Sequence, residues 1–233
     1  MARLPRLYAP QTPQLIEARF AQALTAMSDP VPAVELDQLM TWLQQGAQEY
    51  KVAVHGWLLL NDRLLMLATP PAPDSIARVI QFVARRFATR LRHGRVFAGR
   101  YHSALVEPGH WVLPALMWLE TLPVELHYVD QAERWPWSSA AHHTGKDLTH
   151  SAWATDHVDY WSQGNTPFAR QARYRELLDA GLSALQSQRI QQALFGQWAL
   201  GGAEFPVRLG SRASRRAVPA ARGRPKKHTS TPL

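Results

Sequence analysis

Histidine and tyrosine are the residues of this chain most suited to chemistry, because imidazoles bind metals and phenols act as nucleophiles. The sequence has ten histidines and no cysteine, which excludes a thiol nucleophile and any cysteine-based metal site. The adjacent pair His142-His143 invites a metal interpretation, but adjacent histidines in an exposed turn are more often solvated. His102 and His110 flank an expected strand and are weaker ligand candidates.

Positive charge is concentrated in two stretches of the chain. Residues 75–103 contain seven arginines and no carboxylate. Residues 205–233 contain eight Lys or Arg and no Asp or Glu, so residues 1–204 are neutral overall and the end of the chain carries the net charge of +8. Clustered charge of one sign favours a polyanion such as nucleic acid over the alternative of a solvated helix face and a solubilising tail.

The basic end contains a short motif of its own. Arg222-Gly223-Arg224-Pro225 resembles an AT-hook core, which lies in the narrow minor groove of A·T-rich DNA. The alternative is a generic basic tail that adds salt-dependent affinity for phosphates.

Hydrophobic periodicity predicts the elements that must position these residues. Strands are expected over 12–20, 52–60, 64–69 and 101–106, and helices over 34–50, 74–92 and 108–122. This β-α-β-β-α-β-α order predicts an α+β fold of the ferredoxin-like, split βαβ type, with a four-stranded antiparallel sheet, two helices on one face and an extra helix. A helical hairpin over 166–200 forms a C-terminal extension, and the Arg-, Ser- and Pro-rich chain beyond Gly210 is expected to be disordered.

Seven segments spread over nearly the whole chain carry a family resemblance. They are Met1–Leu7, Gly99–Ser103, Leu119–Val124, Trp135–Ser139, Thr166–Leu177, Leu200–Phe205 and Arg222–Lys227. Their order and spacing resemble those of the REP-associated tyrosine transposases, relatives of the HUH-type single-strand transposases. The resemblance implies recognition of palindromic DNA hairpins and cleavage through a covalent phosphotyrosine. It also implies two strand histidines, one residue apart, that hold Mg²⁺ or Mn²⁺, and a tyrosine nucleophile on the next helix.

This sequence departs from the family pattern at each of those positions. Asn61 to Met66 stand where the family reads Asn-His-x-His-Leu-Leu, so Asp62 and Leu64 take the places of the two histidines. Trp118 takes the place of the tyrosine. Leucine cannot bind a metal and an indole has no hydroxyl. We therefore expect no intact catalytic residue, no metal site and no cofactor.

The expected function is a transposase-family protein that binds hairpin or single-stranded DNA without cleaving it. The residues expected to contact DNA are Arg3, Arg6, Arg78, Arg85, Arg86, Arg90, Arg92, Arg95, Arg100, Arg222, Arg224, Lys226 and Lys227. One alternative is an active transposase with relocated catalytic residues and bound Mg²⁺ or Mn²⁺. Another is a decaying gene product without DNA affinity.

The expected organisation is a transposase-like domain over 1–140, a helical extension over 141–205 and a disordered basic tail over 206–233. The N-terminus has no apolar run of the kind found in signal peptides, and no stretch is long enough to span a membrane. We expect a cytoplasmic, nucleoid-associated bacterial protein that is a monomer or a weak homodimer.

Overall fold

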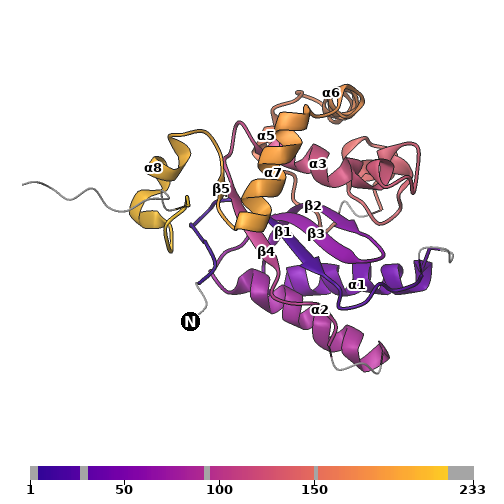
Figure 1. Cartoon of the computed structure of the whole chain (residues 1–233). Helices are drawn as coiled ribbons and strands as arrows, with labels where there is room; N and C mark the ends of the chain where they lie inside the picture. The colour runs from indigo at the N-terminus through magenta and orange to yellow at the C-terminus, as the bar shows by residue number, and fades with distance from the viewer. Residues whose placement is uncertain (1–4, 27–30, 92–94, 150–151, 220–233) are drawn as a thin grey trace, which may run out of the picture.

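The computed structural model describes residues 5–26, 31–91, 95–149 and 152–219. A single sheet lies between two layers of helices (Figure 1). Its strands are β1 (Gln14–Arg19), β2 (Ala53–Leu59), β3 (Arg63–Thr69), β4 (His102–Val106) and β5 (Ala199–Leu200), in the order β2-β3-β1-β4-β5. The pairs β1–β3, β1–β4 and β2–β3 are antiparallel, as the split βαβ prediction requires.

The sheet differs from the prediction at one edge. The two-residue strand β5 pairs in parallel with β4, with Leu105 opposite Ala199. The expected four-stranded antiparallel sheet is therefore a mixed five-stranded sheet. The fifth strand was missed because it is too short for an alternating pattern to show in the sequence.

The helices α1 (Ala33–Glu49) and α2 (Ser75–Leu91) cover one face of the sheet and pack on each other. Leu36, Leu39, Met40 and Leu43 form the buried stripe of α1, at the spacing expected for one helical face. A Cβ atom on Gly46 would lie 3.2 Å from the Phe82 ring, which shows how closely the two helices approach there. Both helices match their predicted ranges within two residues.

The other face is covered by α3 (Val112–Glu125) and α7 (Ala184–Gly196). We expected α3 to end at residue 122, before Pro123, but the helix continues through Pro123 to Glu125. Proline costs the helix one hydrogen bond and is tolerated here in the last turn. Leu116 of α3 lies directly over Gly56 of β2, where an added Cβ would be 2.4 Å from its Cδ2 atom.

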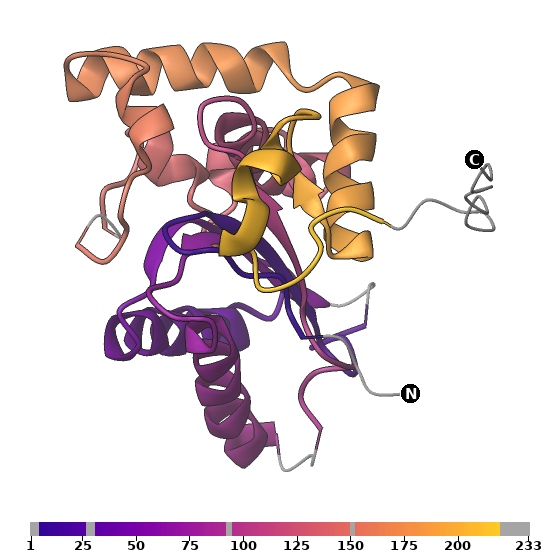
Figure 2. The ribbon, with the colours of Figure 1, turned by 90° about the vertical axis from the view of Figure 1, so that its left-hand side faces the viewer.

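After α3 the chain forms the 3-10 helix η1 (Ala132–Arg134) and the helices α4 (Ala140–His143), α5 (Val158–Trp161) and α6 (Pro167–Ala180), followed by α7. The expected helical hairpin is instead a corner, because α6 and α7 run in different directions (Figure 2). Gly181 ends α6 with a φ of 69°, and Ser183 starts α7 with a capping box. The short connection between these caps turns the chain.

The chain after Leu200 is folded as far as the structure describes it, which corrects the prediction of disorder beginning at 206. Residues Phe205–Leu209 form α8 and Gly210–Arg212 form a 3-10 helix, η2. Phe205, Leu209 and Ala217 are buried against Leu7 and Ala9 in a small second core. Within the described residues, no helix is long and apolar enough to cross a membrane.

Candidate functional site

Four charged side chains form a hydrogen-bonded cluster where the turn between β2 and β3 meets the end of β1. The Arg63 guanidinium donates hydrogen bonds to Asp62, with Nη2 2.6 Å from Oδ2, and to the fully buried Glu17, with Nη1 3.1 Å from Oε1. Arg19 donates to the same Glu17 oxygen at 3.1 Å. Asp62 is therefore bound by a guanidinium, which occupies the carboxylate that a metal would need.

The strand register separates Leu64 from this cluster. Directly opposed residues of paired strands share a face. Leu64 is opposite Ala18, on the face of β1 where Phe20 contacts Phe87 of α2 at 5.9 Å between ring centroids. Leu64 therefore points into the layer of α1 and α2.

Near the turn, the residues of β3 that face α3 and α7 are Arg63, opposite Arg19, and Leu65, opposite Glu17; Leu67, opposite Leu15, follows on the same face. The Arg19 guanidinium lies 5.8 Å from the ring centroid of Phe195 on α7, which identifies this face. Leu64 therefore lies on the face of β3 opposite to α3, and the side chains of β3 that do face α3 near the turn, Arg63 and Leu65, are not metal-ligand types.

Trp118 lies in α3, on the side of the sheet opposite to Leu64, and is only 3 % exposed. Its indole N–H has no hydrogen-bond partner among the residues that the structure describes. The three positions that the sequence grouped together thus do not converge on one pocket.

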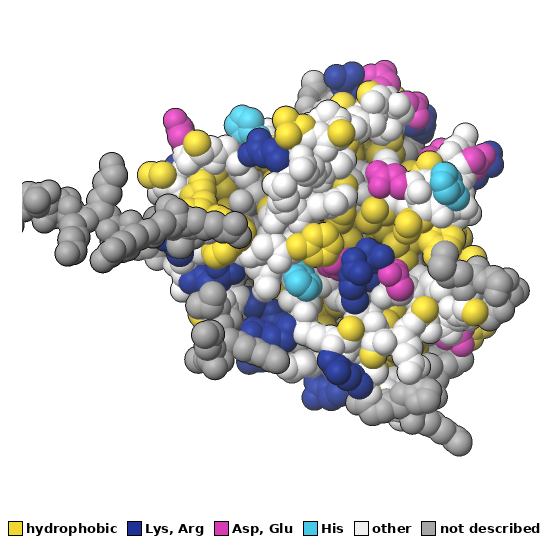
Figure 3. Space-filling view, in the orientation of Figure 1, with side chains coloured by type: hydrophobic (Ala, Val, Ile, Leu, Met, Phe, Trp, Pro, Cys, Tyr) yellow, Lys and Arg dark blue, Asp and Glu magenta, His cyan; other side chains and the backbone are white. Residues whose placement is uncertain are grey.

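The arginines and lysines predicted to contact DNA divide into those that the structure describes and those that it does not. In the described part, Arg78, Arg85, Arg86, Arg95 and Arg100 are exposed, and Arg6 is half-buried with its guanidinium 3.5 Å from the Tyr101 ring centroid. Lys and Arg side chains gather over α2 and the segment before β4 in the lower part of Figure 3. Outside the described residues lie Arg3, Arg92, Arg222, Arg224, Lys226, Lys227 and the side chain of Arg90.

Some of these arginines already have partners within the protein. Arg78 forms an ion pair with Asp74 one helical turn earlier, at 2.7 Å. Arg86 lies over the Phe82 ring at 4.3 Å, and Arg95 donates to the carbonyl oxygens of Phe97 and Ala98. These contacts hold the side chains without neutralising most of them, so the surface stays positive.

A buried polar network that the sequence did not predict lies between α3, α4 and α6. The Glu120 carboxylate is fully buried and accepts hydrogen bonds from the Ser139 hydroxyl and, at 2.8 Å, from the Tyr174 hydroxyl. Its Oε1 atom also lies 2.6 Å from Nδ1 of His143. The sequence signal was an isolated carboxylate within the apolar run 111–124, but its partners lie up to 54 residues away.

His143 is fully buried, and His142 is 11 % exposed at its side chain. This corrects the prediction that the pair is solvated in an exposed turn. Burial lowers the pKa of His143, but the Glu120 carboxylate outweighs it and holds the pKa above its usual value, with help from Asp156 and the His55 carbonyl. His142 Nε2 lies 2.8 Å from Oδ1 of Asp156, in the loop before α5.

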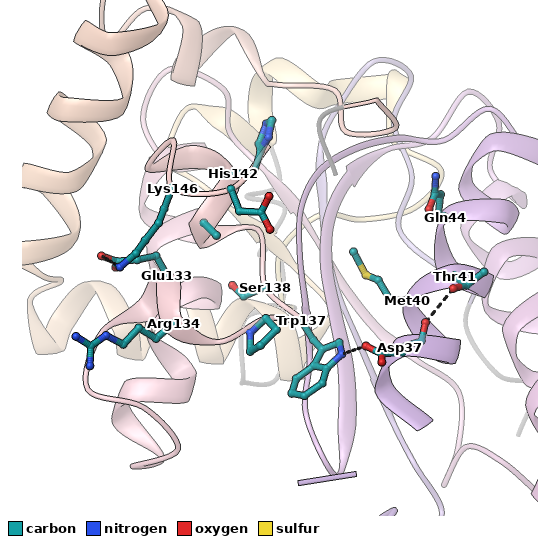
Figure 4. Close-up of a pocket in the computed structure, with 13 residues that line it drawn as sticks. Asp37, Met40, Thr41, Gln44, Glu133, Arg134, Trp137, Ser138, His142 and Lys146 are labelled. Atoms are coloured by element: carbon teal, nitrogen blue, oxygen red, sulfur yellow. Dashed lines mark hydrogen bonds and ion pairs between the residues drawn. The ribbon is translucent and has the colours of Figure 1, made fainter. Parts of the chain in front are cut away.

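Beside this network, a groove of about 730 Å³ separates α1 from the segment of η1 and α4. Figure 4 shows Met40, Thr41 and Gln44 of α1 on one side, and His142, Lys146 and Glu133 on the other. At one end, the Trp137 indole donates to Asp37 at 2.8 Å. The groove gives His142 access to solvent.

No protein-family model matches the chain, and no curated protein does either. Among solved structures, the chain is similar to a REP-associated tyrosine transposase bound to a REP hairpin, with a TM-score of 0.53 and 13 % identity. The match covers 67 % of this chain and 93 % of that protein. Over the 67 % of this chain that the match covers, the two proteins share a fold.

Proposed function

We propose that this protein binds hairpin or single-stranded DNA and does not cleave it. The observation that carries the proposal is the exposed, arginine-rich surface of α2 and the segment before β4, where residues 75–103 contain no carboxylate. Guanidinium groups pair with phosphates, and such contacts supply most of the sequence-independent affinity for nucleic acid. The similar solved structure, which holds a DNA hairpin, supports DNA as the polyanion.

The groups on β3 that face α3 support the proposal that the protein does not cleave DNA. Arg63 and Leu65 supply no metal ligand there, and Trp118 supplies no hydroxyl. The nearby Tyr101 is a poor nucleophile, because burial raises its pKa to about 12. Tyr160 and Tyr174 are buried, with their hydroxyls donated to the His143 carbonyl and to Glu120.

The binding test measures fluorescence anisotropy of a labelled palindromic hairpin, the matching single strand and a plain duplex over a range of salt concentrations. Replacing both Arg85 and Arg86 by alanine is expected to weaken hairpin binding and to lower the salt slope by about 1 for each lost phosphate contact. Arg173→Ala is the matched control, because Arg173 is an exposed arginine on α6, paired with Glu176 at 2.7 Å. Absent binding, binding independent of salt, or an equal loss in the control would overturn the proposal and favour a product without DNA affinity.

The cleavage test incubates the same labelled strands with the protein and Mg²⁺ or Mn²⁺. We expect intact strands and no covalent adduct on a denaturing gel. A protein–DNA adduct would refute the non-cleaving function and establish the alternative, an active transposase with relocated catalytic residues. Mass spectrometry of the adduct would then identify the tyrosine.

A further inference from the structure

We propose that His142, His143 and Asp156 together bind one divalent transition-metal ion, of which Zn²⁺ is the representative. This inference is independent of DNA binding. Nε2 of His142 lies 2.8 Å and Nε2 of His143 lies 3.8 Å from the same Oδ1 atom of Asp156. One ligand atom from each residue lies within 4.8 Å of the other two. Tetrahedral Zn²⁺, with bonds of about 2.0–2.1 Å, separates its ligand atoms by about 3.3 Å, so small side-chain shifts complete the site.

The orientation of His143 supports this assignment. Its Nδ1 atom faces the Glu120 carboxylate at 2.6 Å, so Nε2 is the ring nitrogen on the side of Asp156, 3.8 Å from its Oδ1 atom. That Nε2 atom is buried and makes no hydrogen bond of normal geometry with any described residue. Metal-binding histidines typically donate their other ring N–H to a carboxylate, which fixes the tautomer and the ring orientation. In this protein, Glu120 is the carboxylate that accepts the Nδ1–H of His143.

The charges around the site also favour a cation. Glu120 and Asp156 approach His143 from its two ends, and a divalent ion with two neutral imidazoles would balance both carboxylates. Among the described arginines and lysines, Arg170 acts on Asp156, after the closer His142 and His143, and its guanidinium is stacked over Trp161 at 3.9 Å. Imidazole and carboxylate donors suit Zn²⁺, Ni²⁺ and Cu²⁺ better than Mg²⁺, which prefers oxygen ligands.

The neighbouring histidines, His55 and His157, do not provide a fourth metal ligand. His55 is held at both ring nitrogens, by the Thr155 carbonyl at 2.6 Å and the Thr69 hydroxyl at 2.8 Å. His157 accepts the Asp159 backbone N–H at its Nδ1 atom. The protein therefore supplies three ligands, and a fourth position remains for water from the groove that His142 lines.

A metal at this point would join α4 to the loop that precedes α5. That loop already crosses the edge of the sheet, where the Thr155 N–H donates to the Val54 carbonyl at 2.8 Å. The ion would hold the loop against β2 and stabilise the C-terminal extension. Because it binds only the folded chain, added Zn²⁺ should raise the melting temperature.

The test titrates untagged protein, pretreated with a chelator, with ZnCl₂ in a calorimeter. We expect one Zn²⁺ per chain, together with a visible absorption band of four-coordinate Co²⁺ when CoCl₂ is used as the probe. His142→Ala and Asp156→Ala should each weaken Zn²⁺ binding at least ~10-fold, and Glu120→Gln about 10–100-fold. His143 is left unchanged because it is fully buried and alanine would leave a cavity in its place, whereas Glu120→Gln keeps the size of the buried side chain.

The matched control is His102→Ala, which removes a histidine on β4 whose ring lies 5.9 Å from that of Phe195. In the sheet, β3 and β1 separate β4 from β2, the strand to which the Ser139 N–H, directly before α4, is bonded. This variant should bind Zn²⁺ as the native chain does. Circular dichroism confirms that each variant is folded before titration. Failure of the native chain to bind one equivalent, or equal affinity in the folded His142→Ala and Asp156→Ala variants, would overturn the assignment.

Discussion

Two tyrosines in the buried network provide a matched test of how its hydrogen bonds contribute to stability. Tyr174 donates to the Glu120 carboxylate and Tyr160 donates to the backbone carbonyl of His143, both at 2.8 Å. Both side chains are buried, at 0 % and 3 % exposure. Replacing either by phenylalanine removes one hydroxyl and leaves the ring in place, so the variants differ mainly in the charge of the acceptor.

A hydrogen bond to a charged group contributes about 1.5–3 kcal/mol, against about 0.5–1.5 kcal/mol for a neutral pair. We therefore expect Tyr174→Phe to lower the free energy of unfolding by about 1.5–3 kcal/mol, and Tyr160→Phe by about half as much. The larger loss arises because the fully buried Glu120 would keep only the Ser139 and His143 donors.

The assay is equilibrium urea unfolding at pH 7 in the presence of a chelator, followed by tryptophan fluorescence and circular dichroism. Coincident transitions and an unchanged m-value would show that stability alone has changed. The reasoning is refuted if Tyr160→Phe is as destabilising as Tyr174→Phe, or more so, because the acceptor charge would then not determine the loss.

Three further predictions follow from the packing, the charge and the chain ends. Gly56→Ala should destabilise the fold by about 1–3 kcal/mol, because the new Cβ would lie 2.4 Å from Leu116 Cδ2; unchanged urea unfolding would contradict this. Burial raises the pKa of Tyr101 to about 12 in the folded protein, whereas the same tyrosine ionises near pH 10 in the unfolded chain. Its contribution to the free energy of unfolding is therefore complete below pH 10 and is lost as the pH rises to 12. Between pH 10 and 12, the free energy of unfolding of the native chain should accordingly fall by up to about 2–3 kcal/mol more than that of Tyr101→Phe. Parallel curves of unfolding free energy against pH for the two proteins would contradict this. Removing residues 220–233, which spares α8, should lower DNA affinity and the salt slope by loss of Arg222, Arg224, Lys226 and Lys227; equal anisotropy curves would show that the tail has no role.

Local patterns in the sequence were sufficient to predict the order of the main elements. The apolar stripe of α1 and the strand–turn–strand around Asn61 depend on residues a few positions apart, so periodicity locates them. The lack of metal ligands on β3 was equally a property of the sequence, because no histidine lies between His55 and His93. The arginine excess over 75–103 likewise needed only counting.

The face to which each residue points was decided by the tertiary structure. Alternation along β3 shows that Leu64 and Arg63 point to opposite faces, but only the pairing with β1 and the position of α2 show which face belongs to which helices. The sequence of β3 alone therefore could not show that Leu64 faces α2 while Trp118 lies on the other side of the sheet.

The burial of polar side chains also depended on contacts between distant parts of the chain. Glu120, His143 and Tyr174 come from three helices, and nothing within a few residues of any of them indicates the other two. Short-range patterns record backbone preference and the spacing of apolar side chains. Which carboxylate meets which imidazole is set by the packing of α3, α4 and α6, and for this reason the cluster at His142, His143 and Asp156 emerged only from the folded chain.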